Sequence, residues 1–160
     1  MCQNHSTTLI KMRWQAVSKL VTVMLISMAA VTNTQARDDT DTAINFAKGH
    51  ISTTITGKLS PKQNAHWYQF SAASGQYALI NISALAGTSE TANVGVLHLP
   101  NGTQDGTKGG IIYQGCLPVS GKYRLRIARN LMATQGKTTG YTVEVILLPR
   151  YASHTLCEQI

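Results

Sequence analysis

The sequence predicts an all-β protein, a single antiparallel β-sandwich or jelly roll of about eight short strands. After the first 36 residues no long amphipathic helical pattern appears. Instead, apolar side chains recur with a period of two in short runs. Glycine, serine, asparagine and proline separate these runs, as turn residues do in antiparallel sandwiches and barrels. With 160 residues and no internal repeat, the chain is sized for one ordinary domain.

The first half of this domain contains four predicted strands. Residues 44–46 alternate apolar and polar side chains, and residues 51–59 are rich in threonine and isoleucine. Gly57 lies inside the second run, where an isolated glycine indicates a β-bulge. Residues 66–71 and 77–83 each place apolar side chains on one face and polar ones on the other. Turn residues follow each of the last three runs.

The second half of the domain contains four more predicted strands. Residues 93–99 form a predicted strand, and residues 100–110, with four glycines, a predicted mobile loop. Residues 111–113 form a short strand before Cys116, and residues 141–147 form the last. The polar stretch 129–140 is long for a hairpin connection and indicates an elaborated loop.

The remaining predicted strand, residues 122–127, follows a tight turn. Pro118 restricts the backbone, and Ser120-Gly121 supplies typical turn chemistry. Tyr123 shares the core-facing parity of the strand, which predicts a packed side chain. The opposite face carries three cations, Lys122, Arg124 and Arg126. A small hydroxyl-bearing turn beside cations could enter the cleft of another molecule; an ordinary surface turn before an amphipathic strand is the alternative.

The N-terminus has the layout of a secretory signal peptide. Basic residues precede an apolar run at 20–31, and small residues follow in Thr34-Gln35-Ala36. The apolar run is short for a membrane span, and no lipid-attachment cysteine follows it. We therefore expect a signal peptide over 1–36 and an exported domain over 37–160, with no membrane anchor. That domain holds eleven basic and seven acidic residues, a net charge of +4.

Removal of residues 1–36 leaves two cysteines, Cys116 and Cys157. In an exported chain of this size, two cysteines favour one disulfide bond. Two free buried thiols are the alternative.

No motif indicates catalysis or a cofactor. The histidines lack metal-ligand spacing, and no Cys-x-x-Cys occurs, so we expect no metal site. The sequence shows no second carboxylate placed to form the catalytic pair of a glycoside hydrolase. It also shows no nucleophile elbow and no phosphate-binding glycine loop. The cations do not interleave with aromatic residues as a nucleic-acid surface would require. We therefore expect a protein that is not an enzyme, needs no cofactor and binds no nucleic acid.

Several segments in order resemble the bacterial periplasmic inhibitors of g-type (goose-type) lysozyme. The resemblance extends over about residues 44–148. It is carried by Phe46-Ala47-Lys48-Gly49-His50, the Thr-rich strand to Gly57, Trp67-Tyr68-Gln69-Phe70, Gly75-Gln76, and Leu117 to Arg126.

The resemblance implies a small β-sandwich, related to the domains that follow secreted peptidases, and a periplasmic location. In lysozyme inhibitors of several types a Ser-Gly-x-Tyr loop enters the active-site cleft, which matches Ser120, Gly121, Lys122 and Tyr123. Ser74-Gly75-Gln76-Tyr77 also fits this pattern, but its position matches a turn between strands. The implied partner is a lysozyme, and the implied lysozyme-binding residues are Ser120, Gly121, Lys122, Tyr123, Arg126, Arg129 and Asn130.

Two other functions remain open from the residues alone. The cationic strand face could hold an anionic cell-wall polymer or polysaccharide, as a non-catalytic binding module would. A structural envelope protein without a soluble target is the third possibility.

Overall fold

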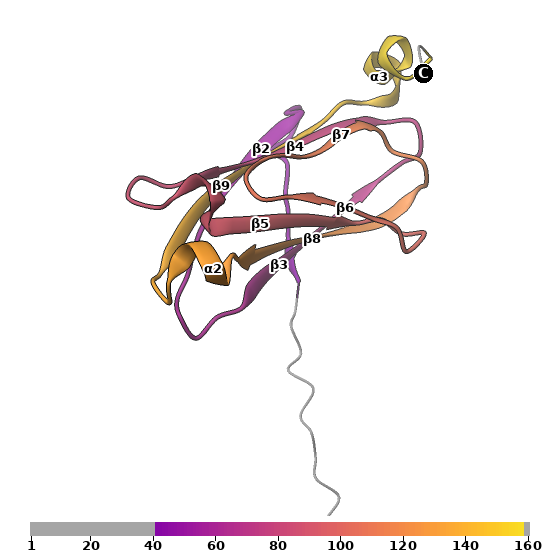
Figure 1. Cartoon of the computed structure of the whole chain (residues 1–160). Helices are drawn as coiled ribbons and strands as arrows, with labels where there is room; N and C mark the ends of the chain where they lie inside the picture. The colour runs from indigo at the N-terminus through magenta and orange to yellow at the C-terminus, as the bar shows by residue number, and fades with distance from the viewer. Residues whose placement is uncertain (1–40, 159–160) are drawn as a thin grey trace, which may run out of the picture. The chain divides into compact units, whose positions relative to one another are not determined.

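Two facing β-sheets make up the described part of the chain, residues 41–158 of a computed structural model (Figure 1). This arrangement confirms the predicted β-sandwich. The predicted signal peptide, residues 1–36, lies outside the described residues. Within residues 41–158, no helix is both long and apolar enough to cross a membrane.

The first sheet has β8 at its centre. Its strand order is β1-β3-β8-β5-β6, and every pairing is antiparallel except that of β1 with β3. The bounds of these strands are β1 Thr42–Ala43, β3 Ala65–Ala72, β5 Asn93–His98, β6 Gln104–Thr107 and β8 Gly121–Arg129.

The second sheet is wholly antiparallel and has the order β2-β9-β4-β7. The bounds are β2 Ser52–Leu59, β4 Tyr77–Ala84, β7 Gly110–Cys116 and β9 Thr139–Leu147. The last strand of the chain therefore lies between the first long strand and β4.

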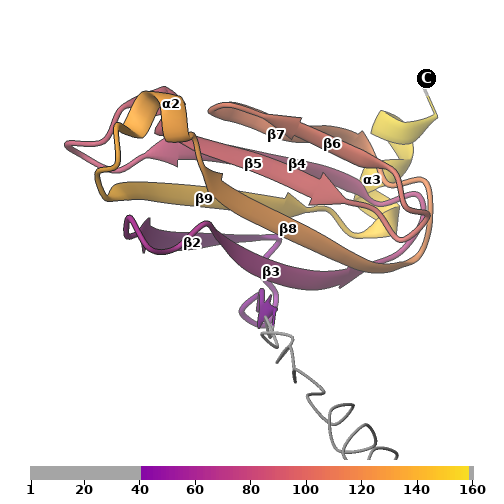
Figure 2. The same ribbon diagram turned by 60° about the horizontal axis from the view of Figure 1, so that its bottom comes forward.

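Three short helices complete the described chain. They are η1 Glu90–Ala92, α2 Leu131–Thr134 and α3 Arg150–Cys157. Both views place α2 and α3 at opposite ends of the sandwich (Figures 1 and 2). The loop that contains α2 is the elaborated 129–140 connection.

The core lies between the sheets, where the period of two places alternate side chains. In β8, Tyr123, Leu125 and Ile127 are fully buried. In β9, Val143 and Val145 are fully buried and face them from the second sheet. Burying one such aliphatic side chain contributes roughly 1.5–3 kcal/mol.

Three local predictions were wrong. Residues 44–46 form no strand, and the first strand, β1, ends just before them at Ala43. The 100–110 segment contains a strand, β6, which pairs with β5 through its backbone although it presents no apolar face. Gly57 is no bulge, since β2 pairs continuously with β9 through it. A Cβ atom at Gly57 would collide with the phenol ring of Tyr141, so the glycine makes room for that buried side chain. The register shift in this sheet lies in the pairing of β4 with β7, between Ile80 and Asn81.

Candidate functional site

The predicted turn, here called the tip (residues 117–121), connects β7 to β8. A second turn, residues 73–76, connects β3 to β4 beside it. Figure 2 places α3 at this same end of the sandwich. The structure therefore brings together three segments that are distant in the sequence.

Four hydrogen bonds join the two turns. The Ser74 amide donates to Ser120 Oγ at 2.9 Å, and Ser74 Oγ donates to the Pro118 carbonyl at 3.0 Å. The backbones of Gly75, Leu117 and Gln76 add two more, each 2.9 Å long: the Gly75 amide donates to the Leu117 carbonyl, and the Leu117 amide to the Gln76 carbonyl. The second Ser-Gly pattern, expected to be a simple turn, is thus the direct support of the first.

Tyr123 supports the tip from inside the sandwich. Its side chain is fully buried, and its ring stacks on Phe70 with centroids 5.5 Å apart. Its hydroxyl donates to the Val119 carbonyl at 2.6 Å, and burial raises the pKa of the phenol. This burial confirms the prediction from strand parity that Tyr123 is a packed residue. Any effect of Tyr123 on a partner must act through the shape of the tip.

The backbone conformation and a close neighbour restrict position 121 to glycine. Its φ is +153°, and a Cβ atom there would lie 3.0 Å from two side-chain atoms of Pro100. Both the backbone and the neighbouring loop therefore disfavour a side chain.

The C-terminal helix braces the paired turns. Cys157 of α3 forms a disulfide with Cys116, the last residue of β7, with the two Cα atoms 5.7 Å apart. Arg150 Nε donates to the Ser74 carbonyl at 3.1 Å. The Tyr77 amide donates to the hydroxyl of Ser153, which is fully buried. The disulfide confirms the prediction from the cysteine count.

Sequence reasoning missed Arg150 and Ser74 as parts of this site. Arg150 follows Pro149, which ends the apolar pattern of the last strand, and the one residue that α3 buries is a serine, Ser153. The repeated Ser-Gly-x-Tyr pattern was the one signal for Ser74. Only the pairing of β3 with β8 places Ser74 against the tip.

The cations of β8 lie on the outer face of the first sheet. Lys122 is exposed and directly follows the tip. Arg124 donates two hydrogen bonds to Asp41, of 2.5 and 2.9 Å, and this pairing lowers the pKa of the Asp41 carboxyl. The guanidinium groups of Arg124 and Arg126 lie 4.4 and 5.9 Å from the Trp67 ring centroid. Arg126 is therefore half-buried against an aromatic ring rather than presented at the tip.

Arg129 and Asn130 lie at the far end of β8. The eight steps from Gly121 to Arg129, at about 3.3 Å each, place Arg129 roughly 26 Å from the tip. Arg129 is only 7% exposed, and its guanidinium donates to Ser60 O at 3.2 Å and Thr134 Oγ1 at 3.4 Å. The Asn130 amide side chain donates to the Thr91 carbonyl at 2.8 Å. The structure does not bring these two residues to the tip, and both serve the fold.

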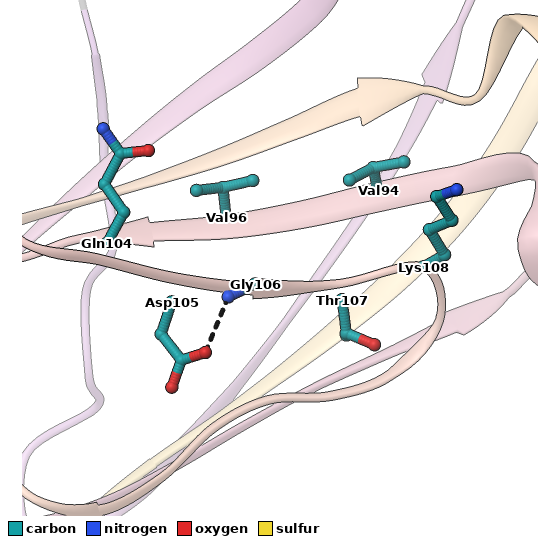
Figure 3. A pocket seen from close by; sticks show the side chains of 7 residues that line it. All are labelled: Val94, Val96, Gln104, Asp105, Gly106, Thr107 and Lys108. Atoms are coloured by element: carbon teal, nitrogen blue, oxygen red, sulfur yellow. Dashed lines mark hydrogen bonds between the residues drawn. The ribbon is translucent and has the colours of Figure 1, made fainter.

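The hollow in Figure 3 lies away from the tip, over β5 and β6. It has a volume of about 620 Å³, with Val94 and Val96 on one side and Gln104 and Lys108 at its ends. Asp105 points away from the two valines. Among residues 41–158, no cluster of histidine, cysteine or carboxylate side chains could hold a metal ion.

These features define a class: a β-sandwich that presents a rigid, braced turn at one end. The structure is similar to periplasmic inhibitors of g-type lysozyme named PliG. The Aeromonas hydrophila protein has a TM-score of 0.55 and 20% identity, over 68% of this chain and 96% of that one. The Salmonella Typhimurium protein has a TM-score of 0.52 and 24% identity, over 68% and 97%. A mutant of the Escherichia coli protein has a TM-score of 0.51 and 25% identity, over 68% and 97%.

Comparisons of sequence alone find nothing. No protein-family model matches the chain, and no curated protein matches it significantly. The likeness to PliG inhibitors is one of fold.

Proposed function

We propose that this protein is a non-catalytic, periplasmic inhibitor of a lysozyme, with g-type lysozyme as its target. The tip would enter the substrate cleft of the enzyme and exclude the peptidoglycan chain. The observation that carries this proposal is the braced pair of turns, which exposes Ser120 at one end of a fold similar to that of named lysozyme inhibitors.

Ser120 has the chemistry to bind a carboxylate. Its oxygen accepts the Ser74 amide, and among residues 41–158 its hydroxyl proton has no acceptor. Glycoside hydrolases act through acidic side chains in their clefts. A hydroxyl donor to such a carboxylate forms a charge-assisted hydrogen bond, and Lys122 beside it adds positive charge.

The rigidity of the tip supports this mechanism. The hydrogen bonds to the second turn, the Tyr123 hydroxyl and the Cys116–Cys157 disulfide hold the backbone before any partner arrives. A preorganised loop loses little conformational entropy on docking. The net charge of +4 on residues 37–160 gives no general attraction to a cationic lysozyme, so the attraction would be local to an acidic cleft.

The test is a lysis assay of g-type, chicken-type and invertebrate-type lysozymes with the purified mature protein. We expect inhibition of the g-type enzyme. Ser120→Ala should weaken it about 10- to 150-fold, because a hydrogen bond to a charged group contributes roughly 1.5–3 kcal/mol. Ser83→Ala, an exposed serine on β4, is the matched control and should change nothing.

Ser120→Ala also removes the acceptor for the Ser74 amide, so a second variant is needed. Lys122→Gln leaves the paired turns intact and should weaken inhibition several-fold, with a smaller dependence on salt. Inhibition that is unchanged in both folded variants would remove the tip from the mechanism. Failure of the parent protein to inhibit any of the three lysozymes would reject the proposed function.

A second candidate function is a non-catalytic module that binds an anionic cell-wall polymer. The observation in its favour is the outer face of the first sheet, where Lys122 and Lys108 are exposed and the half-buried Arg126 lies against Trp67. Retention on an anionic polysaccharide but not on neutral dextran, by a protein that inhibits no lysozyme, would favour this candidate.

A further inference from the structure

The C-terminal helix α3 exposes an aromatic side chain beside the paired turns. Tyr151 is 86% exposed, and Leu156 on the same helix is 46% exposed. Among the large exposed hydrophobic residues of 41–158, Met132 at 90% is exposed more, and it lies on α2 at the opposite end of the sandwich. A large exposed aromatic ring on a fixed backbone is typical of an interface anchor.

The backbone of α3 is fixed on its inner side. Ser153 accepts the Tyr77 amide at 2.8 Å, and its own hydroxyl is directed to the carbonyls of Leu148 and Pro149. Cys157 is bonded to Cys116 at the other end of the helix. Tyr151 therefore has a defined position, and only its two side-chain torsions would become ordered on binding.

A short chain of contacts connects Tyr151 to the tip. Arg150, its neighbour, donates through Nε to the Ser74 carbonyl, and the Ser74 amide donates to Ser120 Oγ. The helix and the tip are thus parts of one rigid surface. A partner that receives Ser120 also meets the start of α3.

The charge of this surface indicates the kind of partner. Lys122 directly follows the tip, Arg150 donates to Ser74 of the second turn, and both are exposed. Within residues 41–158, the two terminal nitrogens of Arg150 have no hydrogen-bond partner. One acidic residue next to α3, Glu158, lies 2.7 Å from His154, and the two cations outnumber it. The surface is therefore complementary to an acidic one.

We propose that α3 is a second contact element for the lysozyme partner: Tyr151 packs on the rim of the acidic cleft, and Arg150 pairs with a carboxylate there, while the tip occupies the cleft. This inference rests on the proposed inhibitor function and adds the contact that selects among lysozymes by the shape and charge of their rims. The sequence resemblance to g-type lysozyme inhibitors ends near residue 148, so α3 would give this chain a contact of its own.

The experiment compares four purified proteins against the lysozyme that the parent inhibits. They are the parent, Tyr151→Ala, Tyr151→Phe and the control Met132→Ala. Tyr151→Ala should raise the inhibition constant about tenfold or more, as a truncated interface anchor does. Tyr151→Phe keeps the ring and should remain within about threefold of the parent. Met132→Ala should match the parent, because it removes an equally exposed side chain from the other end of the molecule.

Circular dichroism and urea unfolding should show four equally stable proteins, since both side chains are exposed. If the parent inhibits and Tyr151→Ala inhibits equally well, the role of α3 is overturned and the tip mechanism stands. If the parent inhibits no lysozyme, the proposed function is overturned and this inference with it.

Discussion

At the scale of single residues, burial distinguishes the side chains that can contact a partner from those that support the fold. Strand parity alone placed Tyr123 inside, and the structure confirms it. Arg129 lies on the same strand parity as Tyr123, but parity does not explain how a cation can be buried there: a carbonyl of Ser60 and a hydroxyl of Thr134, from other segments, accept from its guanidinium. Tertiary hydrogen bonds of this kind leave no periodic trace in a sequence.

The glycine of the tip gives a prediction at this scale. Gly121→Ala should lower the free energy of unfolding by roughly 1–3 kcal/mol, because the new Cβ meets Pro100 in addition to the backbone cost. Gly102→Ala is the matched control: Gly102 also has a positive φ, but a Cβ there meets nothing within 4 Å. Urea unfolding of both variants measures the difference.

If Gly121→Ala is no less stable than Gly102→Ala, the contact with Pro100 does not contribute to the free energy of unfolding. If Gly121→Ala is less stable, a loss of inhibition in any Gly121 variant must be corrected for the unfolded fraction before it is read as a lost contact.

At the scale of elements, the long strands were predictable and the small ones were not. β3, β4, β8 and β9 carry alternating apolar residues that mark their buried faces. β6 has no such pattern, because it is held by backbone pairing to β5. α3 was missed because a serine hydroxyl and a disulfide attach it, in place of buried apolar side chains.

The disulfide gives the prediction for this scale. Replacing both Cys116 and Cys157 by serine should lower the free energy of unfolding by up to about 4 kcal/mol, from loop entropy over the sequence separation of 41 residues. The sandwich should still fold, since its core lies between the sheets. Inhibition should fall more than the unfolded fraction explains, because α3 and the tip lose their common brace.

Urea unfolding and the lysis assay, each with the double variant and the parent, measure these effects. Parent-like inhibition by the folded double variant would show that the turns hold the tip without the helix.

At the scale of the whole molecule, two half-buried imidazoles make stability depend on pH. Burial lowers the pKa of both His66 and His98, and the cations Arg124 and Arg126 lower that of His98 further. His66 Nδ1 lies 2.6 Å from the hydroxyl of Tyr141. The fold therefore favours the neutral form of both rings.

Because the unfolded chain takes up these protons first, stability should fall as the pH drops below about 6.5, the ordinary histidine pKa. Stability should continue to fall until the pH is below the folded-state pKa values of both His66 and His98. Asp41 acts in a lower window: its pKa is lowered by Arg124, so its contribution is present above the ordinary aspartate value and is lost only as the pH falls further. Urea unfolding at pH 7.5 and 5.5 measures the histidine effect.

His98→Gln and His66→Gln should each flatten this dependence. An equally steep pH dependence in both variants would assign it to other groups.

The position of β9 has a consequence for how the protein is made. β9 is an inner strand that pairs along both edges, with β2 and with β4, yet it is the last strand to be synthesised. Before residue 139 emerges, β2 has no neighbour in its sheet, and the second sheet consists of the β4–β7 pair alone. Such long-range closure delays folding until nearly the whole chain is present. A nascent chain of this topology can therefore close its sandwich only after β9 has been made, and can form the Cys116–Cys157 disulfide only after Cys157 has been added.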